Sequence, residues 1–460
     1  MLYLVISGVG EEINEVINMS ENVCHPVDEK LPFGQTVVYG LQHVLAMYAG
    51  AVAVPLILAN ALKLPNDVLI YLINADLFVA GVTTIIQCIG FGPIGSKLPL
   101  MQGVTFAAVT PMIIIGQTHG LTSIFGSTIA AGIITYLLSP YFSKLLRFFP
   151  QVVTGTIITI IGISLLPVAV NWSAGGNPSA LNYANSLYVC LAFVVLIFIL
   201  LLNRYCEGFL SNISVLLGLI FGTSIAIPLG ITDLSKISQA NWIGFTSPFA
   251  FGLPTFEFSS ILAMTVVMLV VMTETTGDLV AIAEIVKKPL HPNDLTKGLR
   301  TDGIGTLIGG IFNSFPHTAF AQNVGLVSLT GIKSRFIVAS GGLILIILGL
   351  LPKAAALVAA IPNPVLGGAG IVMFGMVAAS GIKSLSRVNY EGNKNSLIVA
   401  VSMGVSMIPL AVPSFYHTLP EWAGIVLHSG ITGGTLSAIL LNAFFNEFGT
   451  SIKKQEPNAA

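Results

Sequence analysis

Residues 313–325 read Asn-Ser-Phe-Pro-His-Thr-Ala-Phe-Ala-Gln-Asn-Val-Gly, a polar segment interrupted by proline and glycine between two hydrophobic runs. Backbone that leaves the helix at membrane depth is tolerated only where protein or a water-filled cavity surrounds it. A second weak segment, residues 98–116, contains Pro99, Gln102, Gly103 and Pro111. Interrupted spans at corresponding places in two halves of a carrier point to a binding site at the membrane midplane. The alternative interpretation is a pair of ordinary proline kinks.

Residues 271–280, Val-Met-Thr-Glu-Thr-Thr-Gly-Asp-Leu-Val, put two carboxylates into a long apolar helix. Glu274 and Asp278 are four residues apart and therefore share one helix face. A carboxylate at this depth can hold the N–H groups of a solute by charge-assisted hydrogen bonds, and it takes up a proton when unpaired. Glu274 is therefore predicted to bind solute and protons, with a structural carboxylate bonded to Thr or Ser as the alternative. Asp278 is equally consistent with binding and with support of a neighbouring helix.

The composition places the chain in a bilayer. Hydrophobic residues make up 54% of its 460 residues and charged residues 8%, whereas roughly 25% of a soluble domain is charged. The mean hydropathy is +0.88. Four scattered cysteines without paired spacing support neither a disulfide framework nor a zinc site. No metal or other cofactor is expected.

Fourteen segments of the chain are candidates for membrane spans, which need roughly 20 apolar residues each. Eleven are long: 35–62, 67–91, 119–139, 150–170, 184–203, 208–229, 258–286, 334–351, 364–382, 395–412 and 419–446. Three are shorter or broken: 98–116, 301–312 and 320–332. The sequence therefore predicts an all-α polytopic membrane protein.

The basic residues orient these segments, because Lys and Arg gather in cytoplasmic loops. With the N-terminus in the cytoplasm, the outside loops carry only Lys63, Lys236 and Lys353. The inside loops carry Lys97, Lys144, Arg147, Arg204, Lys287, Lys288, Lys297, Arg300, Lys333, Arg335, Lys383, Arg387 and Lys394. Both termini are expected to be cytoplasmic, with residues 1–31 as a disordered tail.

An internal repeat divides the segments into seven plus seven. The fifth segment opens on Pro-x-x-Val-x-Gly at 150–155, and the twelfth opens on the same pattern at 362–367. Gln102 and Val104 in the third segment correspond to Gln322 and Val324 in the tenth. An odd number of spans in each repeat inverts one half relative to the other, as in many carriers.

Three further residues are candidates near this site. Asp302 stands at the head of the segment 301–312, where it is either an N-cap or the titrating partner of Glu274. His43, inside the first segment, either bridges two helices or relays a proton. Phe106 offers an aromatic face on which a flat heterocycle could stack, although a plain packing role is as consistent.

The segment Gln322-Asn-Val-Gly-Leu-Val-Ser-Leu-Thr-Gly331 resembles the signature of the nucleobase/ascorbate transporter family: Gln or Glu, Asn, any residue, Gly, four of any kind, then Thr. Further blocks are similar to the family's: Gln42-His43, Gln102 to Phe106, Thr273 to Asp278 and Pro364 to Ala369. The resemblance covers about residues 32 to 446. It is nearest to the bacterial branch that takes xanthine and uric acid.

The resemblance implies two inverted seven-segment repeats with broken segments 3 and 10. It implies a core domain at 32–145 and 258–351, a gate domain at 146–257 and 352–446, and a cytoplasmic tail at 447–460. Carried over by position, the residues that bind the base are Glu274, Gln322, Phe106, Ala107, Ala108 and Asn323. Asp302, Asp278 and His43 support the site or couple it to protons.

The expected function is a proton-coupled purine symporter of the inner membrane, often a homodimer in this family, with no nucleic-acid partner. Two positions depart from the family pattern: Gly331 follows the signature Thr, and Ala107 stands where xanthine carriers can have a polar residue. The choice between xanthine and uric acid as substrate therefore stays open. Alternatives are a uracil or other nucleobase carrier, and an anion transporter of the same broad fold. The acids and the absence of Lys or Arg in these segments disfavour an anion. An intramembrane enzyme would need an activated nucleophile or a zinc motif that the sequence lacks.

Overall fold

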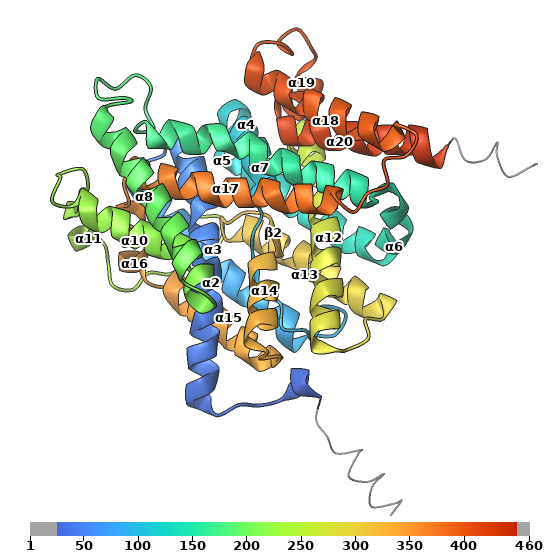
Figure 1. The fold of residues 1–460 in the computed structure, drawn as a ribbon, viewed down its shortest axis with the longest axis horizontal. Coiled ribbons are helices and arrows are strands. Elements are labelled where there is room, and N and C mark those ends of the chain that lie inside the picture. The colour runs from blue at the N-terminus through green and yellow to red at the C-terminus, as the bar shows by residue number, and fades with distance from the viewer. Residues whose placement is uncertain (1–24, 449–460) are drawn as a thin grey trace, which may run out of the picture.

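The computed structural model describes residues 25–448, and most of them are helical (Figure 1). The first half contains η1 (Pro26–Asp28), α2 (Phe33–Ala61), α3 (Asn66–Ile89), β1 (Gln102–Val104), η2 (Phe106–Ala108), α4 (Val109–His119), α5 (Leu121–Leu138), η3 (Ser139–Tyr141), α6 (Phe142–Leu145), η4 (Leu146–Phe148), α7 (Gln151–Ser173), α8 (Ser186–Tyr205), α9 (Phe209–Asn212), α10 (Ser214–Ala226) and α11 (Ser235–Gln239). The second half contains α12 (Phe258–Val286), α13 (Pro292–Ile311), β2 (His317–Ala319), α14 (Ala321–Thr330), α15 (Arg335–Gly349), α16 (Pro352–Ala359), α17 (Asn363–Leu385), α18 (Lys394–Ala411), α19 (Glu421–His428), α20 (Gly430–Asn442) and the π-helical turn η5 (Ala443–Glu447).

The helices make this a multi-pass membrane protein. In the described part of the chain, eight helices are long and apolar enough to cross a bilayer, and nine if α15 and α16, bent by 83°, count as one span. Each of the fourteen predicted segments coincides with one or more helices. Segments 3 and 10 are broken as predicted. Each pairs a short strand with a half-length helix, α4 or α14, and the strand of segment 10 lies just before its predicted start at residue 320.

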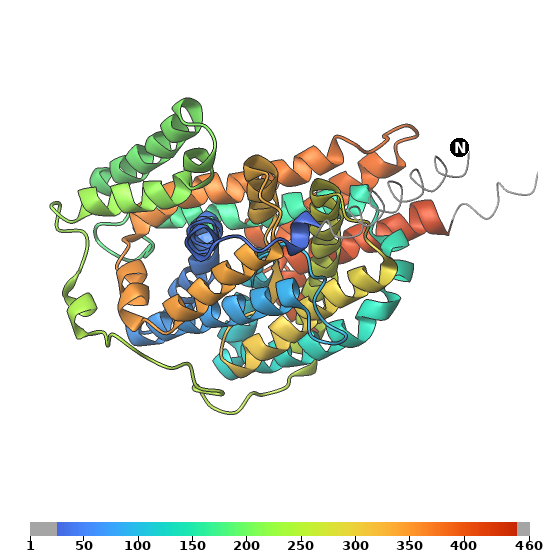
Figure 2. The same ribbon diagram turned by 90° about the horizontal axis from the view of Figure 1, so that it is seen from below.

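Apolar helix faces turned outward fit contact with lipid. Helix α8 exposes Phe193, Ile197 and Leu200, and only 22% of its most apolar stretch is buried. In water such a surface would be an aggregation hazard or a docking site. Figure 2 shows α8 and α10 projecting from one side of the molecule, and the connection between α10 and α12 running along the outside of the other helices.

The pairing of helices follows the repeat. The two helices that open on Pro-x-x-Val-x-Gly, α7 and α17, lie side by side and antiparallel (Figure 1). A Cβ on Gly162 would come within 2.3 Å of the backbone N of Ala378, and one on Gly381 within 2.3 Å of that of Thr159. Only glycine permits this approach, as in small-residue helix interfaces of membrane proteins. Helices α3 and α15 also pack together, and so do their repeat equivalents α13 and α5. Each half therefore contributes one helix to each of these two pairs, and the two pairs are equivalent under the repeat.

Two predicted segments and one missing helix need correction. The ninth segment is not 301–312, because α13 begins at Pro292 with a capping box formed by His291 and Asp294. The last segment, 419–446, is divided at Ser429, whose Oγ accepts a hydrogen bond from the N–H of Thr432 (3.2 Å) and caps α20. The sequence also did not predict α16, which follows the bend after α15.

The predicted N-terminal tail is only partly within the described residues. Residues 1–24 lie outside them, but residues 25–31 are ordered and Val27 is fully buried. The prediction of disorder is therefore wrong for this short stretch. Residues 447 and 448 are described, and the rest of the predicted C-terminal tail is not.

Candidate functional site

The two broken segments meet at a two-stranded antiparallel pair. Strand β1 pairs with β2 so that Gly103 lies opposite Thr318. The pair is extended by backbone hydrogen bonds from Thr105 N to Pro316 O (2.9 Å) and from Phe320 N to Met101 O (3.1 Å). A Cβ at Gly103 would lie 2.6 Å from the Phe320 ring, so a larger residue here would displace that ring. Ladder bonds satisfy the backbone that has left the helix.

A half-helix follows each strand. Helix α4 starts at Val109 beyond η2, and α14 starts at Ala321. Helix N-termini carry free N–H groups and a positive dipole end, which favour electron-rich groups. Gln322 stands in the first turn of α14 and is exposed, as are Gly325 and Ser328 farther along the same helix.

Three carboxyl groups converge from α12 and α13. Glu274 and Asp278 are half-buried on α12, and both lie within electrostatic reach of Asp302 on α13. The side chains of Thr275 and Gln102 are the polar neighbours of Asp302. Neither Asp302 oxygen makes a well-formed hydrogen bond, although the side chain is fully buried. Thr275 links this group to the strands by accepting a hydrogen bond from Ala319 N (3.3 Å).

The position of Asp302 rules out its interpretation as an N-cap. Helix α13 begins ten residues earlier, so Asp302 lies in the middle of a helix and not in its first turn. Because the first half of α13 is polar, a search for apolar runs places the start of the helix too late. The remaining interpretation, that Asp302 is the titrating partner of Glu274, stays a prediction.

Asn323 and His43 form a buried bridge between α14 and α2. The Nδ2 of Asn323 donates to His43 Nδ1 (3.1 Å) and to the His43 carbonyl oxygen (2.9 Å). Both side chains are buried, so Asn323 is turned toward α2 while its neighbour Gln322 is exposed. Of the two interpretations of His43, this geometry favours the bridge.

Phe106 closes the site on the side of α17. Its ring is half-buried and meets Phe374 edge-on, with centroids 5.7 Å apart. Ala107 and Ala108 are buried behind it in η2, which Thr105 caps by accepting the Ala107 N–H (3.2 Å). The predicted residues of the site thus come from four places: α2, η2, α12 to α13, and α14.

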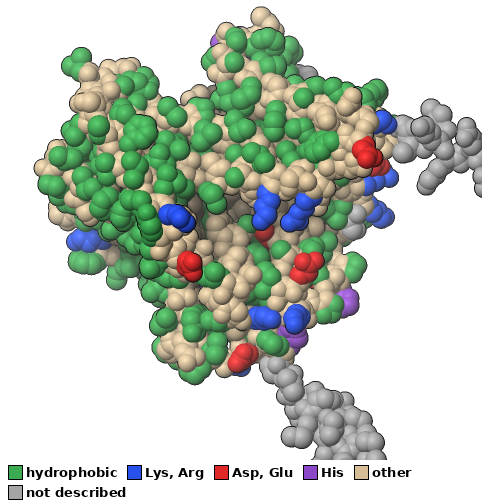
Figure 3. Space-filling model, in the orientation of Figure 1, with side chains coloured by type: hydrophobic (Ala, Val, Ile, Leu, Met, Phe, Trp, Pro, Cys, Tyr) green, Lys and Arg blue, Asp and Glu red, His purple; other side chains and the backbone are tan. Residues whose placement is uncertain are grey.

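The site is reached through an open surface. Exposed positions continue from Gln322 along α14, and from Gly277 along α12 to Glu284. The space-filling view is hollowed near its middle, where Figure 1 places β2 and α14 (Figure 3). A cavity of about 350 Å³ lies elsewhere, among the ends of α7, α17 and α20, and shares no residue with the site.

Comparison with known proteins identifies the family. Residues 34–415 match the family model described as "Permease family". The chain is 51% identical to the uric acid transporter UacT of Escherichia coli (strain K12) over 426 residues, which cover 92% of this chain and 88% of the relative. It belongs to the nucleobase/ascorbate transporter family. It is a permease and not an enzyme.

A second relative supports the family assignment, and a more distant solved structure has the same fold. The xanthine permease of Bacillus subtilis (strain 168) is 44% identical, with 93% of this chain and 98% of the relative covered. Among solved structures, the transmembrane domain of the cyanobacterial bicarbonate transporter BicA superposes with a TM-score of 0.60 at 18% identity, covering 90% of this chain and all of that one. At that identity the likeness shows the fold alone.

One buried acid of this permease was missed by the sequence analysis. Asp76 lies inside α3, is fully buried, and accepts a hydrogen bond from Ser314 Oγ (2.8 Å). Its second oxygen has no partner. The signal was of the same kind as for Glu274, an acid inside an apolar helix. Ser314 lies in the connection from α13 to β2, so Asp76 ties α3 to the segment that positions the strand pair.

We predict that Asp76→Asn retains uptake, because the amide oxygen can still accept the Ser314 hydroxyl. Asp76→Ala should reduce uptake and lower the thermal stability of the purified protein, since an unpaired buried polar group costs about 1–3 kcal/mol. Ser314→Ala combined with Asp76→Ala should cost less than the sum of the two single changes. Complete loss of uptake in Asp76→Asn, at normal membrane levels, would instead make the carboxyl proton essential.

Proposed function

We propose that this permease imports a purine base, xanthine or uric acid, across the cytoplasmic membrane together with protons. The observation that carries the proposal is that the half-buried Glu274 on α12 and the exposed Gln322 at the start of α14 belong to two helices that pack on each other, next to the paired strands. Support for a purine comes from relatives named as uric acid and xanthine permeases, 51% and 44% identical over nine tenths of the chain.

Each group at the site fits a part of an oxidised purine. Glu274 offers two acceptor oxygens to ring N–H groups. Gln322 offers a donor and an acceptor to the other ring, and the first N–H groups of α14 can bond a carbonyl oxygen. The half-buried Phe106 ring supplies a face for stacking. Bicarbonate or another small anion would meet carboxylates here instead of Lys or Arg, so the anion alternative is disfavoured despite the shared fold.

The proposed transport movement shifts core helices α2 to α5 and α12 to α15 against gate helices α7 to α10 and α17 to α20. Helices within each set pack extensively on one another. Contacts between the sets include Phe106 with Phe374, and α12 with α19 and α20. The accessible face leads toward the ends of α12 and α14, near Lys287 and Lys333. Since basic residues mark the cytoplasmic side, the open hollow is assigned to the cytoplasm, as are both termini.

Proton coupling is assigned to the cluster of Glu274, Asp278 and Asp302. Three carboxyl groups within electrostatic reach of one another bind protons in a coupled way. A substrate that donates hydrogen bonds to Glu274 changes how many protons the cluster holds. Purine binding and proton binding are then linked. A homodimer, common in the family, completes the proposal.

We predict that uptake into proteoliposomes follows an imposed proton gradient and does not need sodium. Radiolabelled xanthine or uric acid should accumulate when the outside is acidic, and a protonophore should abolish accumulation. Replacing sodium by choline should leave the rate unchanged. Uptake that requires sodium and persists with the protonophore would refute the coupling to protons. Uptake of neither purine, with uracil or bicarbonate taken up instead, would refute the substrate.

A further inference from the structure

The N-terminal residues 25–31 run across the ends of the helices that carry the site. In Figure 1 the short helix η1 lies near the lower ends of α12 and α14, away from the start of α2. Val27 in η1 is fully buried and belongs to an apolar cluster with residues of the 98–100 segment, α12, β2 and α14. The members are Leu98, Leu100, Leu279, Ile282, Ala283, Val286, Ala319, Val324 and Val327.

This cluster adjoins the site directly. Leu279 follows Asp278 on α12, and Val324 follows Asn323 on α14. Val27 therefore belongs to the same apolar cluster that joins the two helices carrying Glu274 and Gln322. A well-packed interior transmits the loss of even one or two methyl groups to its surroundings.

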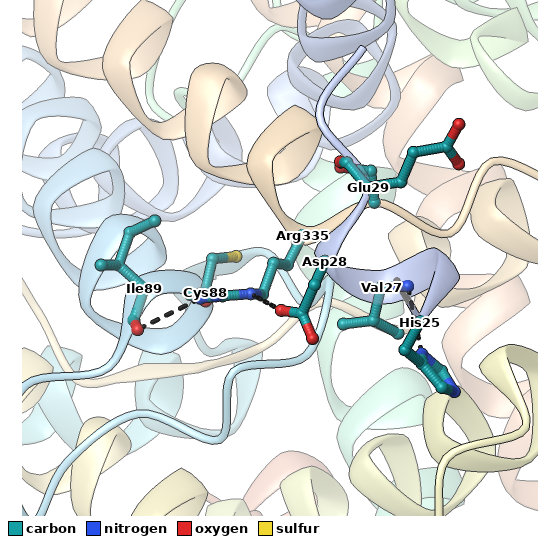
Figure 4. A network of polar contacts seen from close by, with 8 residues as sticks. His25, Val27, Asp28, Glu29, Cys88, Ile89 and Arg335 are labelled. Atoms are coloured by element: carbon teal, nitrogen blue, oxygen red, sulfur yellow. Dashed lines mark hydrogen bonds and ion pairs between the residues drawn. The ribbon is translucent and has the colours of Figure 1, made fainter. Parts of the chain in front are cut away.

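A single arginine fastens the segment. Arg335, at the start of α15, donates from Nε to Asp28 Oδ1 at 2.5 Å (Figure 4). It also donates from a terminal nitrogen to the carbonyl oxygens of Cys88 (2.9 Å) and Ile89 (3.2 Å), at the end of α3. Those carbonyls have no partners within their own helix and carry negative dipole charge, so a guanidinium suits them. The neighbouring Ser334 Oγ donates to the Glu29 carbonyl oxygen (2.6 Å).

The fastening is specific to Asp28 and not shared by the acid beside it. The side chain of Glu29 points away from Arg335 in Figure 4, and only its backbone carbonyl takes part. The Arg335 and Asp28 side chains are 15% and 38% exposed, so water only partly screens the ion pair. Thr36 Oγ1 donates to the Leu31 carbonyl oxygen (3.1 Å) and fixes the other end of the segment to α2.

We infer that residues 25–31 form a strap, fastened by the Asp28–Arg335 pair, that holds α12 and α14 at the spacing needed for purine binding. Asp28, Arg335 and Val27 are positioning residues, since they act on Glu274 and Gln322 through packing. This inference rests on the proposed function for its binding readout. The ordering of the strap itself can be tested without any substrate.

The test compares Asp28→Asn and Val27→Ala with the matched control Glu29→Gln, which removes a neighbouring carboxylate without touching Arg335. Amide hydrogen exchange of the purified proteins should become faster in residues 26–31 and in the first turns of α14 for the first two variants only. The dissociation constant of radiolabelled xanthine or uric acid should rise about two- to fivefold, as expected for the loss of one partly exposed ion pair. The conservative change Val27→Ile should retain most of the affinity.

The possible outcomes distinguish failure of the strap proposal from failure of the proposed function. If the unaltered protein binds neither purine, the proposed function fails, and exchange alone then decides whether the strap orders α14. If the unaltered protein binds purine and Asp28→Asn changes neither exchange in α14 nor affinity, the strap is refuted. Faster exchange confined to residues 26–31, with normal affinity, refutes it as well. An equal loss of affinity in Glu29→Gln would mean that the loss of any negative charge in this segment lowers affinity, which would refute a specific role for the Asp28–Arg335 pair.

Discussion

Glu274→Gln is expected to abolish purine uptake while the protein remains in the membrane at its normal level. The carboxylate supplies two acceptor oxygens to ring N–H groups, whereas the amide supplies one acceptor and presents a donor in place of the other. Losing a hydrogen bond to a charged group costs about 1.5–3 kcal/mol, or about ten- to a hundredfold in affinity. Binding of labelled xanthine and uric acid to the purified variant measures this loss directly.

The matched control for this variant is Glu284→Gln. Glu284 lies on the same helix, farther toward its end, and is exposed. Its replacement should leave both binding and uptake near normal. If Glu274→Gln also transported normally, Glu274 would be a structural carboxylate, and the site would have to be sought away from α12.

The sequence predicted the parts of the fold that depend on apolar length. A run of about 20 apolar residues has few ways to cross a bilayer other than as a helix, so helices such as α2, α7 and α12 were located with boundaries close to the observed ones. Proline and glycine at 98–116 and 313–325 marked the broken spans for the same reason. What the pattern could not supply was the antiparallel pairing of β1 with β2, because that is a contact between distant segments.

Boundaries failed where polar residues are buried by tertiary contacts. The first half of α13 contains Asp294, Lys297 and Arg300, yet Gly298 and Leu299 are buried. A count of apolar residues therefore started the helix too late and made Asp302 look like a cap. The division at Ser429 is the opposite case, since a single N-cap side chain interrupts an apolar run that otherwise reads as continuous.

The candidate site was predictable by residue type but not by role. Acids and amides within apolar helices identified Glu274, Asp278, Asp302, Gln322 and Asn323. Only the coordinates separate the exposed Gln322 from the adjacent Asn323, whose amide is bonded to His43. Asp76 was overlooked because its helix is otherwise an ordinary span, and its partner Ser314 lies 238 residues away in the chain.

Gln322→Glu is expected to change which purine is preferred and not simply to weaken binding. The change removes both N–H donors at the exposed start of α14 while keeping an acceptor. A site built to bond a polar group of its substrate discriminates strongly once that partner is lost. Uric acid has a carbonyl at C8 that xanthine lacks and is largely anionic at neutral pH. It should therefore lose more affinity than xanthine when a second carboxylate faces it.

Competition constants of xanthine and uric acid against one labelled purine provide the measurement. Ser328→Ala on the same helix is the matched control, because Ser328 is also exposed but lies two turns away from Gln322. Its ratio of constants should equal that of the unaltered protein, while the ratio for Gln322→Glu should shift toward xanthine. An equal change in both constants would mean that Gln322 does not face the part of the base where the two purines differ. The substrate would then lie with its six-membered ring toward α14, and Glu274 would contact the five-membered ring instead.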